Sequence, residues 1–154
     1  MAWDLPHAIA SFWVMGLDVK FFIKDFYTKW WFLGFFKSIG AIGVNRKKHN
    51  NLVDYAIQLL KENKRLVIMV PAEGTRKRVE KWKGGFYNIA KAANVPIGLG
   101  YLDYKNKTAG VALLVDISES KEKDLTIIEN VYKKFTGKFP ELYNPEIFIR
   151  EKAE

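Results

Sequence analysis

The residues with the clearest chemical potential lie in one short segment that follows an apolar run. Residues 65–70 read RLVIMV, and residues 71–76 read PAEGTR. Five basic side chains stand within eight residues at the end of this segment: Arg76, Lys77, Arg78, Lys81 and Lys83. A guanidinium such as that of Arg76 can bind a phosphate group through two parallel hydrogen bonds. The alternative interpretation is a turn at the end of a strand with a solvated basic rim.

The rest of the composition limits the chemistry that is available. The chain has no cysteine, which excludes disulfides, thiolate metal sites and a cysteine nucleophile. Its two histidines, His7 and His49, lie in different segments, and no cluster of carboxylates indicates a metal site, so we expect no metal and no tightly bound cofactor. The formal net charge of +8 favours an anionic partner, which could be nucleic acid, anionic lipid or a phosphorylated substrate.

Aromatic side chains are concentrated between residues 12 and 36, with lysines interleaved. This mixture is typical of a surface at the headgroup level of a membrane, where aromatic rings and lysines are both favoured. The candidates for membrane contact are Trp30, Trp31, Phe35 and Phe36. The alternative is that many of the aromatic residues fill the core. No apolar run reaches the roughly 18 residues that a spanning helix requires, so we expect a peripheral association with the membrane surface.

Apolar periodicity and turn residues predict the elements that position these groups. Helices are predicted over residues 5–15, 30–38, 51–62 and 85–93, and a last helix is predicted to place Ile128, Val131, Tyr132 and Phe135 on one face. Strands are predicted over residues 19–23, 41–44, 65–70, 95–101 and 110–117. We expect the 65–70 strand to be covered on both faces, and the last two strands to be antiparallel because a short turn joins them. The pattern predicts one α/β domain over residues 1–154, with a mostly parallel central sheet flanked by helices and an amphipathic aromatic helical region at its N-terminus.

Four blocks in order resemble the glycerolipid acyltransferase family, whose members include the 1-acylglycerol-3-phosphate (lysophosphatidate) acyltransferases. Residues 71–76 (PAEGTR) are similar to the family's proline-Glu-Gly-Thr-Arg motif. Residues 43–46 (GVNR), 82–86 (WKGGF) and 95–97 (VPI) resemble the blocks that surround that motif. The resemblance runs from Trp3 to about Tyr104, and four ordered blocks are far more specific than one short motif.

The resemblance implies roles for individual residues. The family's first block is a histidine, four variable residues and an aspartate, in which the histidine is the general base and the aspartate orients it. Asp4 matches the aspartate, and the histidine position falls upstream of Met1, so we expect an N-terminally truncated member, with a natural pseudoenzyme as the less favoured alternative. His7 has the wrong spacing to replace the base. By the same resemblance, the acceptor's phosphate region is held by Arg46, Glu73, Gly74, Thr75 and Arg76.

The resemblance also implies the reaction and its setting. The expected reaction is acyl transfer from acyl-CoA or acyl-carrier protein to a hydroxyl of a lysophospholipid or glycerol-phosphate acceptor, at the cytoplasmic face of a membrane and without nucleic acid. The 154-residue chain itself is expected to be inactive. A shared site further predicts that Asp4 and Arg76 open onto one cleft, on the order of 10 Å apart. The alternative function is a non-catalytic basic module that binds a membrane surface or nucleic acid.

Overall fold

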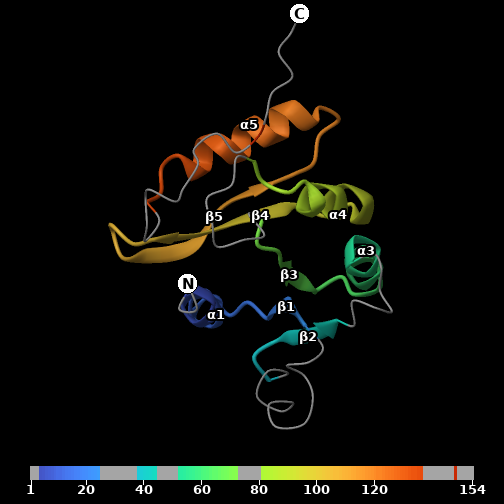
Figure 1. Cartoon of the computed structure of the whole chain (residues 1–154), viewed down its shortest axis with the longest axis horizontal. Coiled ribbons are helices and arrows are strands. Elements are labelled where there is room, and N and C mark those ends of the chain that lie inside the picture. Colours follow the sequence, from blue (N-terminus) through green and yellow to red (C-terminus); the bar gives the residue numbers. More distant parts are fainter. Residues whose placement is uncertain (1–3, 25–37, 45–51, 73–80, 137–147, 149–154) are drawn as a thin grey trace, which may run out of the picture.

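The computed structural model describes residues 4–24, 38–44, 52–72, 81–136 and 148, with the backbone alone for residues 4–6, 24 and 44. Its elements in chain order are α1 (Asp4–Val14), β1 (Val19–Lys24), β2 (Ala41–Val44), α3 (Leu52–Glu62), β3 (Val67–Met69), α4 (Gly85–Ala93), β4 (Ile97–Asp103), β5 (Thr108–Val115) and α5 (Lys121–Tyr132) (Figure 1). The α/β class predicted from the sequence is confirmed.

The first layer is a parallel sheet in the order β2-β1-β3. β1 is its central strand, and Val19 and Phe21 of β1 are buried. The register pairs Phe21 with Ala41 of β2 and with Met69 of β3. Three strands that run the same way end at one edge of the sheet, which is where α/β folds place their ligands.

The second layer is an antiparallel pair, β4 and β5, which carries the main apolar core. Leu99 of β4, Val115 of β5 and Ile128 of α5 form a buried cluster on one face of this pair. Figure 1 shows α5 above the pair and α1 below it. On the lower face, a side chain at Gly100 would meet the ring of Phe12 of α1 at 3.5 Å, so the glycine allows α1 to approach closely.

Most predicted elements are confirmed, with small changes at their ends. The strand over 41–44 and the helix over 85–93 have the predicted bounds, and β4 and β5 are antiparallel as expected. The sequence did not indicate that the parallel strands and the antiparallel pair would form two separate sheets among the described residues. Of the predicted helix over 30–38, only Ser38 lies within the described residues.

The prediction for residues 65–70 is wrong in one respect. β3 has only three residues, Val67 is 42% exposed, and Ile68 and Met69 are half-buried, so the strand is not covered on both faces. The reason is its place in the sheet. β3 pairs only with β1 among the described strands and forms an edge, whereas a continuous apolar run predicts a central strand. The buried central position belongs to β1 instead.

Candidate active site

The strand ends define where a site in the parallel sheet would lie. Lys24, Val44 and Met69 are the last residues of β1, β2 and β3, and the parallel register brings these ends to one edge. Arg46 follows the end of β2 by two residues, and residues 73–76 follow the end of β3 by four to seven. The topology therefore brings together the points from which the two predicted phosphate-binding segments leave the sheet.

The side chains predicted to do the chemistry lie outside the described residues. This holds for the phosphate-binding set and the membrane-contact set: Arg46, Glu73, Gly74, Thr75, Arg76, Trp30, Trp31, Phe35 and Phe36. Asp4 is placed by its backbone, as the first residue of α1. The predicted separation of about 10 Å between Asp4 and Arg76 remains a prediction.

Residues 73–82, called the PAEGTR loop below because they include the EGTR part of the motif, are flanked by two residues that share a backbone hydrogen bond. The backbone N–H of Lys83 donates a hydrogen bond to the carbonyl of Ala72 at 3.0 Å. Ala72 directly precedes Glu73, and Lys83 opens the approach to α4. The two residues that flank 73–82 therefore lie side by side.

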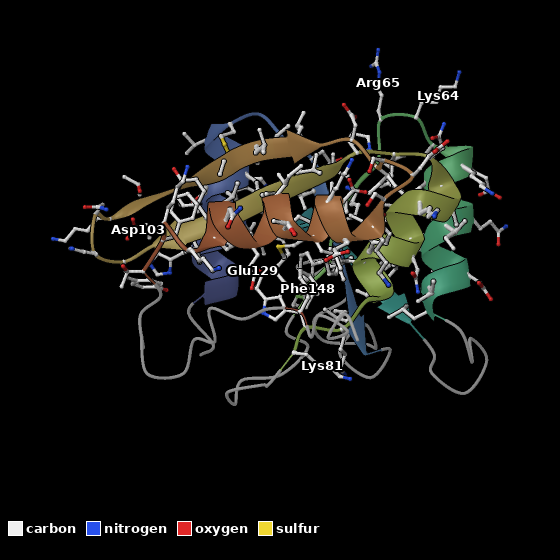
Figure 2. All side chains as sticks on the ribbon, turned by 90° about the horizontal axis from the view of Figure 1, so that it is seen from above. Lys64, Arg65, Lys81, Asp103, Glu129 and Phe148 are labelled. Carbon is white, nitrogen blue, oxygen red and sulfur yellow. The ribbon has the colours of Figure 1, made fainter. Side chains whose placement is uncertain are left out.

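Trp82 fixes the base of this loop to the second layer. Its ring lies 5.1 Å from that of Tyr132 of α5, 6.4 Å from that of Phe86 of α4 and 6.3 Å from that of Phe148, measured between ring centroids. All four of these rings pack against the core of Leu99, Val115 and Ile128. Tyr132 is itself fixed, because its hydroxyl donates to the carbonyl of Gly100 at 2.9 Å. Figure 2 shows Phe148 and Lys81 toward the same side of the molecule.

A family model shows which family the chain belongs to. The model named Acyltransferase matches residues 1–98, which is 98 of the 154 residues. The chain belongs to the acyltransferase family. The match extends from α1 into β4, so it includes all four blocks on which the resemblance was based, and it ends before β5 and α5. Neither a curated protein nor a solved structure matches the chain.

The anchoring of the loop by Trp82 is a feature of this acyltransferase that the sequence reasoning missed. The WKGGF block was recognised, but as the start of α4. The signal available was the spacing of two aromatic rings, Trp82 and Phe86, four residues apart at a helix start. Their partners Tyr132 and Phe148 lie 50 and 66 residues after Trp82, and no local pattern connects them.

Asp124 is the most deeply buried carboxylate that the structure describes, at 2% exposure. It accepts hydrogen bonds from the hydroxyl of Tyr87 at 2.8 Å and from the backbone N–H and the hydroxyl of Ser118 at 2.9 and 2.7 Å. Burial works to raise the pKa of Asp124, but the hydrogen bonds from Ser118 and Tyr87, with the positive charge of Lys91, leave the pKa below its usual value. Burial and the Asp124 carboxylate raise the pKa of Tyr87 to about 12. This ionised carboxylate therefore ties α4 to the start of α5, which is a structural role.

Asp103 is a second buried carboxylate that accepts several hydrogen bonds, and it stabilises the turn between β4 and β5. It accepts from the side chain of Asn106 at 2.8 Å and from the backbone N–H groups of Lys105 and Asn106. The Asn106 side chain lowers the pKa of Asp103, against the effect of burial. All its donors belong to the turn or the backbone, so we assign it no role in the reaction.

Two further properties of the described residues bear on the site. They contain no group of three or more histidine or carboxylate side chains that could hold a metal ion. Within the same residues, no helix has both the length and the apolar character needed to cross a bilayer.

Proposed function

We propose that this acyltransferase moves a fatty acyl group from a thioester, either acyl-CoA or acyl-carrier protein, to a hydroxyl of a lysophospholipid or glycerol-phosphate acceptor, as a step of phospholipid biosynthesis. The observation that carries the proposal is the common edge of β2 and β3, from which the segments with Arg46 and with residues 73–76 both leave. Two arginines that start from one edge suit an acceptor that carries a phosphate group.

The proposed step needs a base, an orienting carboxylate and phosphate contacts. The acceptor oxygen attacks the thioester carbonyl as the base takes its proton; the C–S bond then breaks, and the thiolate leaves and regains the proton. Asp4 would orient the base and stabilise its protonated form. Arg46 and Arg76 would bind the phosphate, Gly74 and Thr75 would shape the loop, and Glu73, being acidic, would fix an arginine rather than touch phosphate.

The base is the part of this mechanism that the 154 residues do not supply at the family's spacing. We predict that the 154-residue polypeptide has no measurable acyltransferase activity, because loss of a general base commonly costs about 10²- to 10⁴-fold in rate. Adding the dipeptide His-Xaa ahead of Met1 places a histidine five residues before Asp4 and should restore turnover. An Ala-Xaa extension is the matched control. Equal turnover of lysophosphatidate with acyl-CoA by both extended chains would contradict the assignment of Asp4.

Arg76 offers a second test in the His-extended chain. Arg76→Ala should raise the KM for a phosphate-bearing acceptor by about tenfold or more, because a charge-assisted bidentate contact is lost. Arg76→Lys keeps the charge but loses the two parallel hydrogen bonds, so its KM should lie between those of the parent and of Arg76→Ala. The control is an acceptor without phosphate, such as a monoacylglycerol, for which the two variants and the parent should be alike. A uniform loss of kcat on both acceptors would instead indicate a structural role.

We also propose that the protein acts at the cytoplasmic face of a membrane as a peripheral protein. The support is the number of aromatic residues between residues 12 and 36, the interleaved lysines and the net charge of +8. Trp30, Trp31, Phe35 and Phe36 are the proposed contacts.

A further inference from the structure

β5 presents an uncharged and exposed edge. Within the described part of the chain it hydrogen-bonds only to β4, and no charged residue occurs from Thr108 to Val115. Val111 to Leu114 are all exposed, and Leu114 reaches 65%. The alternation of inward and outward side chains fails here because of a bulge: two steps on β4, from Gly98 to Gly100, are matched by three on β5, from Leu114 back to Val111.

The carboxyl end of α1 extends this apolar surface. Figure 2 shows that end of α1 emerging past the outer side of β5, and α1 packs on β5. Val14 is 89% exposed and Trp13 is 58% exposed. We call the combined surface the β5 rim, defined by Val111, Leu113 and Leu114 of β5 with Trp13, Val14 and Met15.

The end of α1 is fixed in shape. The N–H of Leu17 donates to the carbonyl of Phe12 at 2.9 Å and the N–H of Gly16 to that of Trp13 at 3.0 Å, with Gly16 at φ +70°. This is the hydrogen-bond pattern of a Schellman motif, which closes the helix and satisfies two of its last carbonyls. The exposed apolar side chains of α1 therefore stand on a defined backbone.

The backbone chemistry of the β5 rim selects the kind of partner. The outer edge of a strand carries N–H and C=O groups that need hydrogen-bond partners once water is removed. A lipid surface supplies few such partners, whereas another strand supplies them in register. An exposed apolar edge without lysine or proline is also the kind of edge that soluble proteins avoid leaving uncovered. A partner that adds a strand fits these observations best.

The charges at the two ends of β5 indicate which strand that is. Lys107 directly precedes β5 and Asp116 directly follows it, and both are exposed. When two copies of β5 pair antiparallel about a two-fold axis near the middle of the strand, the Lys107 end of one copy lies beside the Asp116 end of the other, twice. The bulge bends the edge, and a two-fold mate carries the same bend. We propose that the β5 rim is a homodimer interface in which two β5 strands pair antiparallel.

This inference goes beyond the proposed acyl transfer and does not depend on it. In Figure 2, the end of α1 lies on the side of Lys64 and Arg65, and Lys81, which follows the PAEGTR segment, lies on the other side. A dimer formed through the β5 rim would therefore leave the carboxyl edge of the parallel sheet accessible in both copies.

The first test is sedimentation velocity of the 154-residue chain over a range of concentrations. We expect a monomer–dimer equilibrium, and Leu114→Lys and Val14→Lys should each raise the dissociation constant by about tenfold or more. Leu52→Lys, on an exposed leucine of α3, is the matched control and should leave the dissociation constant unchanged. At concentrations at which every chain is monomeric, all four chains should have the same thermal unfolding profile, since the substituted side chains are exposed in the monomer.

The second test is a charge exchange that depends on the antiparallel arrangement of the two strands. Lys107→Asp should weaken the dimer because it places two carboxylates opposite each other, and adding Asp116→Lys should restore it. A monomer at every concentration, an open series of larger oligomers, or a double variant no better than Lys107→Asp would overturn the proposal. A monomeric chain whose Leu114→Lys variant loses vesicle binding would assign the rim to lipid and would also overturn it.

Discussion

Asp124 and Trp82 hold the same pair of helices at two separate points. Asp124 joins Tyr87 of α4 to Ser118 at the start of α5 through charge-assisted hydrogen bonds. Trp82 joins Phe86 of α4 to Tyr132 at the end of α5 through ring contacts. The PAEGTR loop ends next to Lys83, two residues before α4 begins. The contacts of Asp124 and Trp82 therefore fix α4 against α5 next to the end of the proposed phosphate-binding loop.

The Asp124 network gives a prediction about stability and pH. Asp124→Asn should lower the free energy of unfolding by about 1–3 kcal/mol at pH 7, because buried donors lose a charged acceptor. A carboxyl whose folded pKa is lowered stabilises the protein above the pKa of the unfolded chain, and this contribution is lost as the pH falls through the folded pKa. The difference between the parent and the variant should therefore be full at pH 7 and shrink below about pH 4. Urea unfolding at both pH values measures it.

Two further variants control that experiment. Tyr87→Phe removes one of the donors and should cost about 1 kcal/mol, less than Asp124→Asn. Glu119→Gln removes an exposed carboxylate from the same connection and should leave the free energy of unfolding within about 0.5 kcal/mol of the parent. If the gap between the parent and Asp124→Asn is the same at pH 3 and pH 7, the carboxylate is not the source of the stabilisation.

At the scale of elements, the turn into β2 depends on one glycine. Gly40 has φ +90°, and a Cβ at this position would lie 2.4 Å from the carbonyl oxygen of Val19. Its own carbonyl accepts from the N–H of Phe21, so the turn is tied to the central strand. β2 leads directly toward Arg46, and the geometry of this turn therefore sets where that segment leaves the sheet.

We predict that Gly40→Ala lowers the free energy of unfolding by about 3 kcal/mol, since it combines a left-handed backbone with a close contact. Gly85→Ala is the control: it lies in the first turn of α4, where a Cβ would meet only Val53 at 3.8 Å, and it should be neutral or slightly stabilising. Thermal or urea unfolding of the two variants checks this. A neutral Gly40→Ala would show that the turn has a different backbone conformation.

The elements also show how far the sequence could predict this structure. The strand over 41–44 and the helix over 85–93 were predicted with their bounds because each has its own turn residues, Gly40 and the Gly84-Gly85 pair. The burial of β3 was mispredicted because an apolar run does not reveal the number of neighbouring strands. The candidate site residues came from a family motif, whereas the contact of Trp82 with Tyr132 depends on packing across about 50 residues. Such long-range contacts have no local signal.

At the scale of the whole molecule, our proposal of a membrane partner depends on the net charge of +8 and on the aromatic residues between residues 12 and 36. A basic protein binds both anionic lipid and nucleic acid through counterion release and Coulomb attraction. Duplex nucleic acid is bound mainly through its phosphates, whereas a lipid surface adds an apolar contribution from Trp and Phe side chains. The two alternatives therefore differ in their dependence on aromatic residues rather than on charge.

The last prediction uses that difference. The 154-residue chain should sediment with vesicles that contain anionic lipid, and far less with purely zwitterionic vesicles. Trp30→Ala/Trp31→Ala should reduce vesicle binding by about tenfold or more, because two interfacial aromatic side chains are lost while the charge is unchanged.

Trp13→Ala is the matched control: Trp13 is 58% exposed but belongs to the β5 rim, so its loss should weaken the dimer and leave vesicle binding largely intact. Binding to a double-stranded oligonucleotide should be weak, should fall steeply with salt, and should be the same in the parent and the double variant. Vesicle binding that is unaffected by the double substitution would show that Trp30 and Trp31 are not membrane contacts. Tight oligonucleotide binding at physiological salt would favour the nucleic-acid module over the membrane-bound acyltransferase.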